Sequence, residues 1–239
     1  MGRTRPALIR LLLSALGAQL LVTLTALAGS YPAHAGSLAS VRLTYKVNGT
    51  PTEANFNPVS NNGVLGGYGY SKTGVGSFTY YLNPGQYRMI GIATNGLSGG
   101  ISNLCTVSTD STTDCPVAIP APNFPFQITN SDGSNYAKPA NLAMTIKRTV
   151  DGNLFDFSWN NTAQDSGTLA LQDGTYLISV FNQTDAALAK ANGQSVNQFD
   201  FNLVMSGGAV SSFGQVGGSS ISPTGGKYHL PIKPNNFHS

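Results

Sequence analysis

Apolar and polar residues alternate in several stretches of this 239-residue chain, and the stretches are bounded by turn-forming pairs. Val41–Val47 alternates and ends at Asn48-Gly49, while Leu142–Ile146 alternates and is followed by Asp151-Gly152 and a return stretch, Leu154–Trp159. A side-chain period of two is that of a β-strand, and Asn-Gly and Asp-Gly favour two-residue hairpin turns. The pattern therefore predicts an all-β fold.

The rest of the chain after residue 35 supports this fold class. Phe199–Met205 alternates in the same way, and only Asp185–Ala191 permits a short helical turn. Charged residues make up 10% of the chain, and its 28 glycines suit tight turns that require positive φ.

A hairpin signature occurs twice. Ser77–Ile90 aligns without a gap with Ser166–Ser179, 89 residues later, and Ser, Thr, Leu, Gly and Tyr recur at matching positions. In each copy we expect the Leu to enter the core, the Gly to take the turn and the Tyr to face inward. An alternating strand ending at Asn48-Gly49 or Asp151-Gly152 precedes each copy. Two tandem β-sandwiches are predicted, and the alternative is chance recurrence of a common hairpin in one large sandwich.

Prolines locate the boundary between the two predicted units. Five of them fall within 116–139, where they interrupt any central strand. We therefore expect one sandwich at residues 36–120 and a second at 121–205. The Gly-, Ser- and Pro-rich segment 206–239 is expected to be a flexible tail, because it offers little apolar surface to bury.

The two turns resemble a known family pattern. Leu82-Asn83-Pro84-Gly85-Gln86-Tyr87 and Leu171-Gln172-Asp173-Gly174-Thr175-Tyr176 are similar to the Leu-x-Pro/Asp-Gly-x-Tyr turn of bacterial prealbumin-like and carboxypeptidase-regulatory-like domains. The resemblance implies Ig-like seven-stranded sandwiches that serve as non-catalytic modules of surface and secreted proteins. It does not extend to the intramolecular Lys–Asn bonds of some relatives, because no Lys here pairs with an Asn at a family spacing.

The first 35 residues have the features of a signal peptide. Three arginines precede a charge-free apolar run, and Ala33-His34-Ala35 offers small residues at the two places that a signal peptidase requires. Cleavage would leave Gly36 as the first residue of an exported protein. The alternative is an uncleaved membrane anchor, since a run of about twenty apolar residues can span a bilayer.

Removal of that segment makes the chain neutral. The net charge of +3 comes from 13 basic and 10 acidic residues, and three of the basic residues are Arg3, Arg5 and Arg10. A neutral chain without basic clusters argues against nucleic acid as a partner.

The two cysteines of the chain, Cys105 and Cys115, lie close together in a polar stretch. In an oxidising compartment they are expected to form a disulfide. A metal site is the alternative, but two thiols without a nearby His leave a zinc shell incomplete.

No residue set predicts catalysis, a cofactor or a metal. Gly96-Leu97-Ser98-Gly99-Gly100 fits the Gly-x-Ser-x-Gly pattern, but that motif needs a helix and a His as base, and after residue 35 only His229 and His238 occur. The segment Asn130–Asn135 carries alternating oxygen ligands that resemble a calcium loop, but it holds one carboxylate, Asp132, which favours an ordinary Asp-Gly turn.

Aromatic residues supply the candidate binding sites. Tyr68 and Tyr70 lie in a Gly-rich segment and suit contact with a sugar or a protein, unless their rings fold back over the sandwich. Trp159 shares a strand face with two phenylalanines, which predicts either a sugar platform or a core stripe.

Tyr228, Leu230 and Ile232 have strand spacing within the expected tail, so they are candidates for a strand donated to another copy, the alternative being a disordered end. Together these features predict a secreted, periplasmic or cell-surface protein without enzymatic activity. Its role is adhesive, structural or ligand-presenting, and its partner is an unknown protein or glycan. A carbohydrate-binding accessory protein is the alternative, and a secreted hydrolase is the third possibility.

Overall fold

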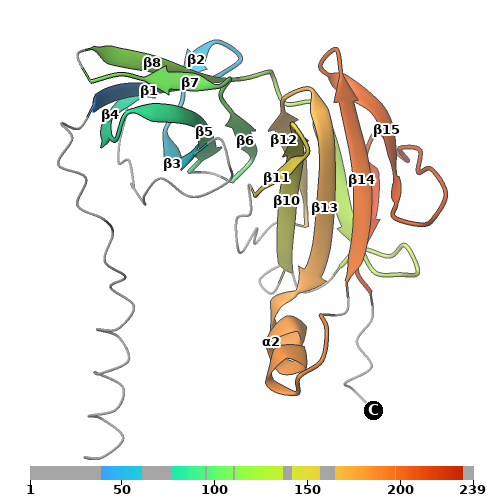
Figure 1. Cartoon of the computed structure of the whole chain (residues 1–239). Coiled ribbons are helices and arrows are strands. Elements are labelled where there is room, and N and C mark those ends of the chain that lie inside the picture. The colour runs from blue at the N-terminus through green and yellow to red at the C-terminus, as the bar shows by residue number, and fades with distance from the viewer. Residues whose placement is uncertain are drawn as a thin grey trace, which may run out of the picture. The chain divides into compact units, whose positions relative to one another are not determined.

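The computed structural model describes residues 39–60, 77–94, 96–109, 111–136, 142–156, 165–196 and 198–233, and these residues form an all-β protein, as predicted (Figure 1). The strands, in chain order, are β1 (Ala39–Val47), β2 (Thr50–Pro51), β3 (Ala54–Ser60), β4 (Ser77–Leu82), β5 (Gly85–Ala93), β6 (Ser98–Ile101), β7 (Cys105–Val107), β8 (Thr112–Ile119), β9 (Phe124–Thr129), β10 (Leu142–Val150), β11 (Asn153–Asp156), β12 (Ser166–Leu171), β13 (Gly174–Asn182), β14 (Phe199–Ser206), β15 (Ala209–Gln215) and β16 (Tyr228–Pro231).

The described helix, α2 (Gln183–Ala191), covers the segment where the sequence permitted a helical turn. Asn182 caps it: the side-chain oxygen accepts hydrogen bonds from the backbone N–H groups of Thr184 and Asp185. Asp185 lies in the first turn and Lys190 in the last, which complements the helix dipole.

The first sheet, called the β1 sheet, is built around the alternating strand β1. β4 pairs with β1 antiparallel, β8 pairs with it parallel, and β2 returns from it through Asn48-Gly49. Both turn residues have positive φ, 48° and 77°, as a two-residue hairpin requires. Val41, Leu43 and Tyr45 are fully buried, so the predicted alternation is confirmed.

A second sheet, the β13 sheet, has the order β11-β10-β13-β14-β15. Its β10–β11 hairpin turns through Asp151-Gly152, as predicted, again with positive φ at both residues. The third sheet runs β16-β9-β12-β6-β5-β3, with β7 also paired to β5. This long sheet contains strands from both halves of the chain, because β6 and β12 pair in parallel.

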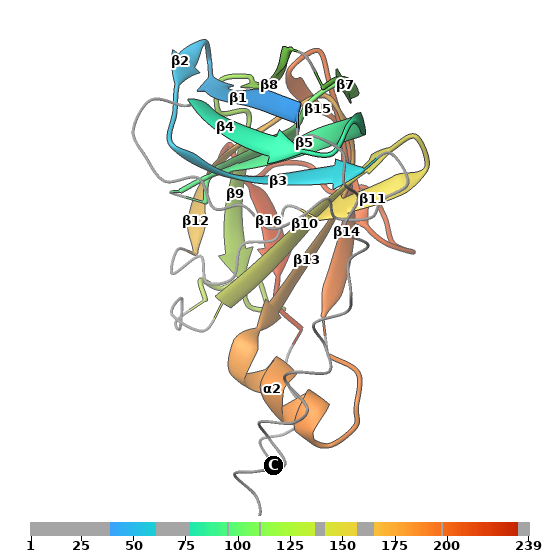
Figure 2. The ribbon, with the colours of Figure 1, turned by 60° about the vertical axis from the view of Figure 1, so that its left-hand side comes forward.

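Each half of the long sheet faces another sheet across a hydrophobic core, which is the β-sandwich arrangement. Strands β3, β5 and β7 share a core with the β1 sheet. Strands β9, β12 and β16 share a core with the β13 sheet, and the two layers are visible in Figure 2. We call these the first and the second repeat. They belong to one compact unit, Leu38–Ser239.

The repeated hairpins have equivalent places in the two repeats. β4 and β12, and likewise β5 and β13, begin and end 89 residues apart, and β5 and β13 show the same order of buried and exposed residues. Leu82 and Leu171 are buried, as expected. The hydroxyls of Tyr87 and Tyr176 each donate to the carbonyl oxygen four residues earlier, at 3.0 and 2.7 Å.

The strands that precede these hairpins are not equivalent, contrary to the interpretation of the sequence. β1 pairs with the first strand of its hairpin, β4, whereas β10 pairs with the second strand of its own, β13. By pairing, β10 corresponds to β3 and β1 corresponds to β9. The alternation of a strand and the turn that follows it do not determine with which other strand it pairs.

The segment 206–239 is not a tail over its described part, so that expectation is wrong. β15 pairs with β14, and β16 pairs in parallel with β9, just as β8 pairs with β1. Leu230 on β16 is 0% exposed, and Ile232, which follows this strand, is 6% exposed, so the segment belongs to the chain's own core and is not an unpaired strand for another copy. Its glycines, such as Gly225 and Gly226 at positive φ, make the turns between core strands.

The predicted boundary at 120/121 falls between β8 and β9, but the long sheet crosses it. Val59, Ile90 and Ile101 from the first half also belong to the hydrophobic cluster of the second repeat. Two tandem sandwiches would imply that residues 126–205 fold independently of residues 37–120. This stays a prediction, and such a fragment would lack β15 and β16.

The two repeats join their facing sheets in different ways. In the first repeat the predicted disulfide is present: Cys105 lies on β7 and Cys115 on β8, so the bond links the long sheet to the β1 sheet. In the second repeat an aromatic cluster lies between the two facing sheets. Phe213 packs against Phe124, Phe201 and Tyr228 with ring centroids 5.2–5.5 Å apart.

The core role of β16 predicts the effect of a single truncation. Leu230→Ala should lower the free energy of unfolding by about 2–5 kcal/mol, because it leaves a cavity among fully buried side chains. Val216→Ala, at a residue that is 48% exposed, is the control and should change it by less than about 0.5 kcal/mol. Urea denaturation of both variants measures the difference, and equal small effects would restore the tail interpretation.

A second prediction concerns Tyr45, whose ring occupies space left by Gly91. A Cβ at Gly91 would lie 2.5 Å from the Tyr45 ring, so Gly91→Ala should destabilise the protein by about 1–3 kcal/mol. Gly218→Ala, where the nearest atom would be 3.4 Å away, is the control. By strand pairing, Ile128 and Val180 take these places in the second repeat. The double variant Tyr45→Ile/Gly91→Val should therefore lose less free energy of unfolding than the sum of the losses in the two single variants. Strict additivity of the losses would contradict the packing account.

Candidate functional site

The residues in the Gly-x-Ser-x-Gly pattern form no nucleophile site. Ser98 is 4% exposed, begins strand β6, and its Oγ accepts a hydrogen bond of 2.9 Å from the Tyr45 hydroxyl. Burial raises the pKa of Tyr45 to about 12, so this pair stays neutral and serves packing. The described ranges contain no group of three or more His, Cys, Asp or Glu residues that could hold a metal ion.

The predicted binding residues have different outcomes. Tyr68, Tyr70 and Trp159 lie outside the described residues. Tyr228 and Leu230 lie on β16 and Ile232 follows it, with Leu230 and Ile232 buried in the core. In the Asn130–Asn135 loop the Asp132 carboxylate accepts from the backbone N–H and hydroxyl of Ser134, which lowers the pKa of that carboxyl.

A group of specific polar contacts lies where the two repeats meet. β6 of the first repeat and β12 of the second pair in parallel at Ser98–Ala170 and Gly99–Leu171. Gln172 follows directly, and its side-chain amide donates to the carbonyl oxygens of Ile101 (3.1 Å) and Ala118 (2.7 Å). Its side-chain oxygen accepts from Ile101 N at 2.9 Å. One glutamine of the second repeat thus binds two strands of the first.

Glycine at position 100 makes this approach possible. A Cβ there would lie 2.2 Å from the Ile119 side chain and 2.8 Å from the Gln172 amide carbon. Gly100 therefore has a packing role in a strand where glycine otherwise weakens structure.

Arg148 connects Gln172 to the rest of the second repeat. It donates to Gln172 Oε1 at 2.5 Å and to the carbonyl oxygen of Asp173 at 2.6 Å. Gly174, at φ 149°, leaves room for it, since a Cβ would lie 2.7 Å from Arg148 Nε. The Asp173 carboxylate accepts from the backbone N–H groups of Gly207 and Gly208, which anchors the β14–β15 turn to the same network.

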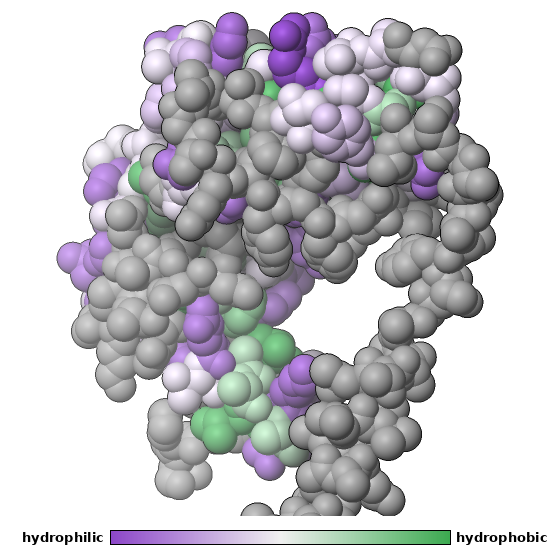
Figure 3. Space-filling model, turned by 90° about the vertical axis from the view of Figure 1, so that its left-hand side faces the viewer, coloured by the Kyte–Doolittle hydropathy of each residue, from purple (hydrophilic) through white to green (hydrophobic). Residues whose placement is uncertain are grey.

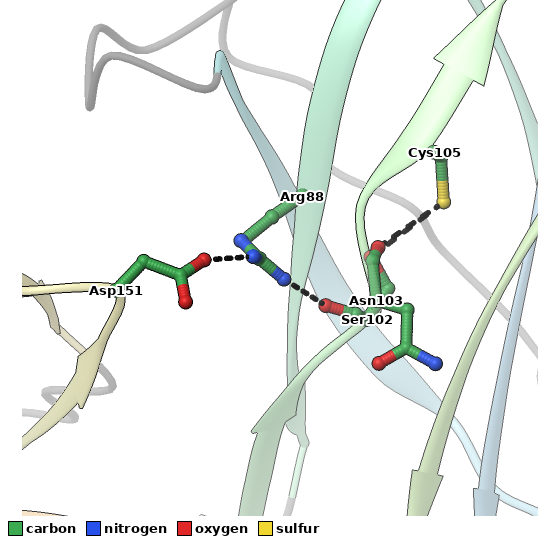
Figure 4. Close-up of polar contacts among 5 residues, drawn as sticks. All are labelled: Arg88, Ser102, Asn103, Cys105 and Asp151. Atoms are coloured by element: carbon green, nitrogen blue, oxygen red, sulfur yellow. Dashed lines mark hydrogen bonds and ion pairs between the residues drawn. The ribbon is translucent and has the colours of Figure 1, made fainter.

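Arg88 makes a further link between the repeats (Figure 4). Its guanidinium forms an ion pair with Asp151, in the β10–β11 turn, and donates to the carbonyl oxygen of Ser102 at 3.4 Å. Ser102 Oγ accepts from Met89 N and donates to the carbonyl oxygen of Asn103, which lies 3.4 Å from Cys105 Sγ. Because the Asp151 side chain is 71% exposed, this pair contributes little stability and mainly orients the turn.

Two hollows accompany these features. A cleft of about 340 Å³ lies at the junction, lined by apolar side chains of Val47, Leu97, Pro122 and Ala170. A shallower hollow of about 650 Å³ lies beside α2. Figure 3 shows apolar residues gathered in the lower part of the view, where α2 lies in Figure 1. Within the described residues no helix is both long and apolar enough to cross a membrane.

Comparisons with known proteins assign no family. No protein-family model matches the chain, and no curated protein matches it. Among solved structures it is similar to a C-terminal fragment of the pilus adhesin SpaC from Lactobacillus rhamnosus GG, at 13% identity and a TM-score of 0.29, over 81% of this chain and 96% of that one.

Two further solved structures show the same low similarity. A leucine-rich repeat protein from Bacteroides thetaiotaomicron gives 13% identity and a TM-score of 0.28, over 83% of this chain and 26% of that one. The major pilin of Streptococcus pyogenes gives 9% identity and a TM-score of 0.18, over 61% of this chain and 82% of that one. Similarity at these TM-scores is too low to assign a function.

Gln172→Ala tests the junction. The substitution leaves the buried Ile101 N–H and two carbonyl oxygens without their partner, so it should lower the free energy of unfolding by about 1–3 kcal/mol. Asn83→Ala is the matched control, because Asn83 occupies the equivalent turn of the first repeat with an exposed side chain. Thermal and urea unfolding compare the two, and a similar small effect from both would show that the glutamine network does not hold the repeats together.

Proposed function

We propose that the protein is an exported, non-catalytic structural or adhesive module of the cell surface. Its two Ig-like repeats act as one stiff unit. The proposal rests chiefly on the junction, where β6 and β12 join the repeats in one sheet and Gln172 hydrogen-bonds to two strands of the neighbouring repeat. Exposed linkers with few contacts usually connect tandem domains, so this junction is unusually well held.

A stiff junction suits a protein that transmits force or presents a surface at a distance. Force applied across the junction is shared by the parallel strand pair and by the Gln172 hydrogen bonds to β6 and β8. The Cys105–Cys115 disulfide adds a covalent bond between the two sheets of the first repeat, which suits an oxidising compartment.

The remaining parts of the proposal come from the sequence. Residues 1–35 are removed on export, residues 36–120 and 121–205 carry the two prealbumin-like modules, and the segment 206–233 completes the second one. Partners are proteins or glycans at the surface, and the neutral charge of the exported chain favours no polyanion.

Export and signal-peptide cleavage are tested on cells that produce the protein. Intact cells should release its peptides on brief trypsin treatment, and the intact mass should begin at Gly36. A protease-protected cytoplasmic chain that retains Met1–Ala35 would contradict export.

Single-molecule pulling on residues 36–239 tests the mechanical role. We expect one main unfolding event in which both repeats extend together, since the sheet is shared. Gln172→Ala should split it into two events at lower force, whereas Asn83→Ala should behave as the unsubstituted protein. Two independent low-force events in the unsubstituted protein would overturn the stiff-module proposal.

A further inference from the structure

The outer face of the β1 sheet carries an ordered group of polar side chains and one aromatic ring. The strand register places Ser40 between Tyr81 and Thr112, and places Arg42 between Thr79 and Asp114. Side chains alternate along a strand, and Val41, Leu43, Leu82 and Cys115 point into the core, so these six point outward. We call Ser40, Arg42, Thr79, Tyr81, Thr112 and Asp114 the Tyr81 face.

Tyr81 is the apolar element of this face. It is 66% exposed, more than any other large hydrophobic residue of the described ranges. Around it the face carries three hydroxyls, from Ser40, Thr79 and Thr112, and the Thr112 hydroxyl donates to Ser40 Oγ at 3.3 Å. A tyrosine ring offers a flat apolar surface with a hydrogen-bonding tip at low entropic cost.

Arg42 and Asp114 form an ion pair with no net charge, in the row of side chains next to that of Tyr81. Arg42 Nε lies 2.6 Å from one carboxylate oxygen and Nη2 lies 2.8 Å from the other, and both side chains are 57% exposed. The two-pronged contact holds both groups in one plane. The arginine lowers the pKa of the Asp114 carboxyl, so the pair stays charged but has no net charge. Its outer edges still offer donors and acceptors to a ligand.

The second repeat shows that the fold does not require this face. The residue equivalent to Tyr81 is Ala170, which is 1% exposed and paired with Ser98 at the junction. The residue equivalent to Arg42 is Pro125. The same strands therefore form without the ring or the ion pair, and the group on the first repeat needs an explanation other than folding.

We propose that the Tyr81 face binds a neutral glycan. The ring of Tyr81 stacks against the apolar face of a sugar, and the hydroxyls together with the Arg42–Asp114 pair hydrogen-bond to sugar hydroxyls. Neighbouring strands are about 4.8 Å apart and same-face residues about 6.8 Å apart along a strand, so the face measures about 10 by 7 Å. That area suits a short oligosaccharide.

Other ligands fit this surface less well. A polyanion would need a net positive charge, and here Arg42 is neutralised by Asp114. A stable protein partner would need several large buried anchors, whereas this face has one. The inference deepens the adhesive branch of the proposed function and rests on it.

Affinity electrophoresis provides the test, with the exported chain run through gels containing a neutral polysaccharide. Mannan, xyloglucan, arabinogalactan and dextran are the neutral probes, and heparin and alginate are the anionic ones. At least one neutral polymer should retard the protein, and Tyr81→Ala should weaken that retardation about tenfold, while Tyr81→Phe keeps most of it. Asp114→Asn should weaken it as well.

Leu154→Ala is the matched control, because Leu154 is 59% exposed on β11 of the other repeat. It should not change retardation, and melting curves of all variants should agree within a few degrees. Retardation by anionic polymers alone, by none of the neutral ones, or equally in Tyr81→Ala would overturn the glycan site. Those results leave the pulling experiment unaffected, so the two proposals fail separately.

Discussion

The parallel pairing of β6 with β12 is the constraint on which the rest of the structure depends. It converts two sandwiches into neighbours that share a sheet, and it is possible because Gly100 leaves room for Gln172 and Ile119. Gln172 then satisfies backbone groups of β6 and β8 that would otherwise lack a partner at the junction. The repeats are thus connected by directional hydrogen bonds, which define their relative placement more strictly than apolar contact alone.

The same pairing pattern is stabilised by different side chains in the two repeats. The first repeat has a disulfide between its sheets and a tyrosine, Tyr45, that fills the space above Gly91. The second has the Phe124–Phe201–Phe213–Tyr228 cluster instead. Both solutions fill the space between two sheets, one with a covalent bond and the other with large aromatic surfaces.

The candidate binding surface shows the limit of a sequence interpretation. Aromatic residues in Gly-rich segments, Tyr68 and Tyr70, attract attention in the sequence, whereas Tyr81 lies within the repeated hairpin and looks like any other strand residue. Alternation does predict that Tyr81 and Leu82 point to opposite faces of the sheet. The neighbours of Tyr81 on its face include Arg42, 39 residues earlier in the chain, and Asp114, 33 residues later. Their proximity follows from strand register, which only the folded chain defines.

The sequence by itself determined the local features: the strand class, the hairpin turns at Asn48-Gly49 and Asp151-Gly152, the inward tyrosines of the two Leu-x-x-Gly-x-Tyr turns, and the cysteine pair. These depend on interactions between residues close in the chain, such as a side-chain period and turn φ values. Tertiary structure alone decided that β1 pairs with β8, that β6 pairs with β12, and that Tyr228–Pro231 is a core strand. All three are parallel pairings between distant segments, whose strength comes from the burial they create together, so no short stretch of sequence carries their signal.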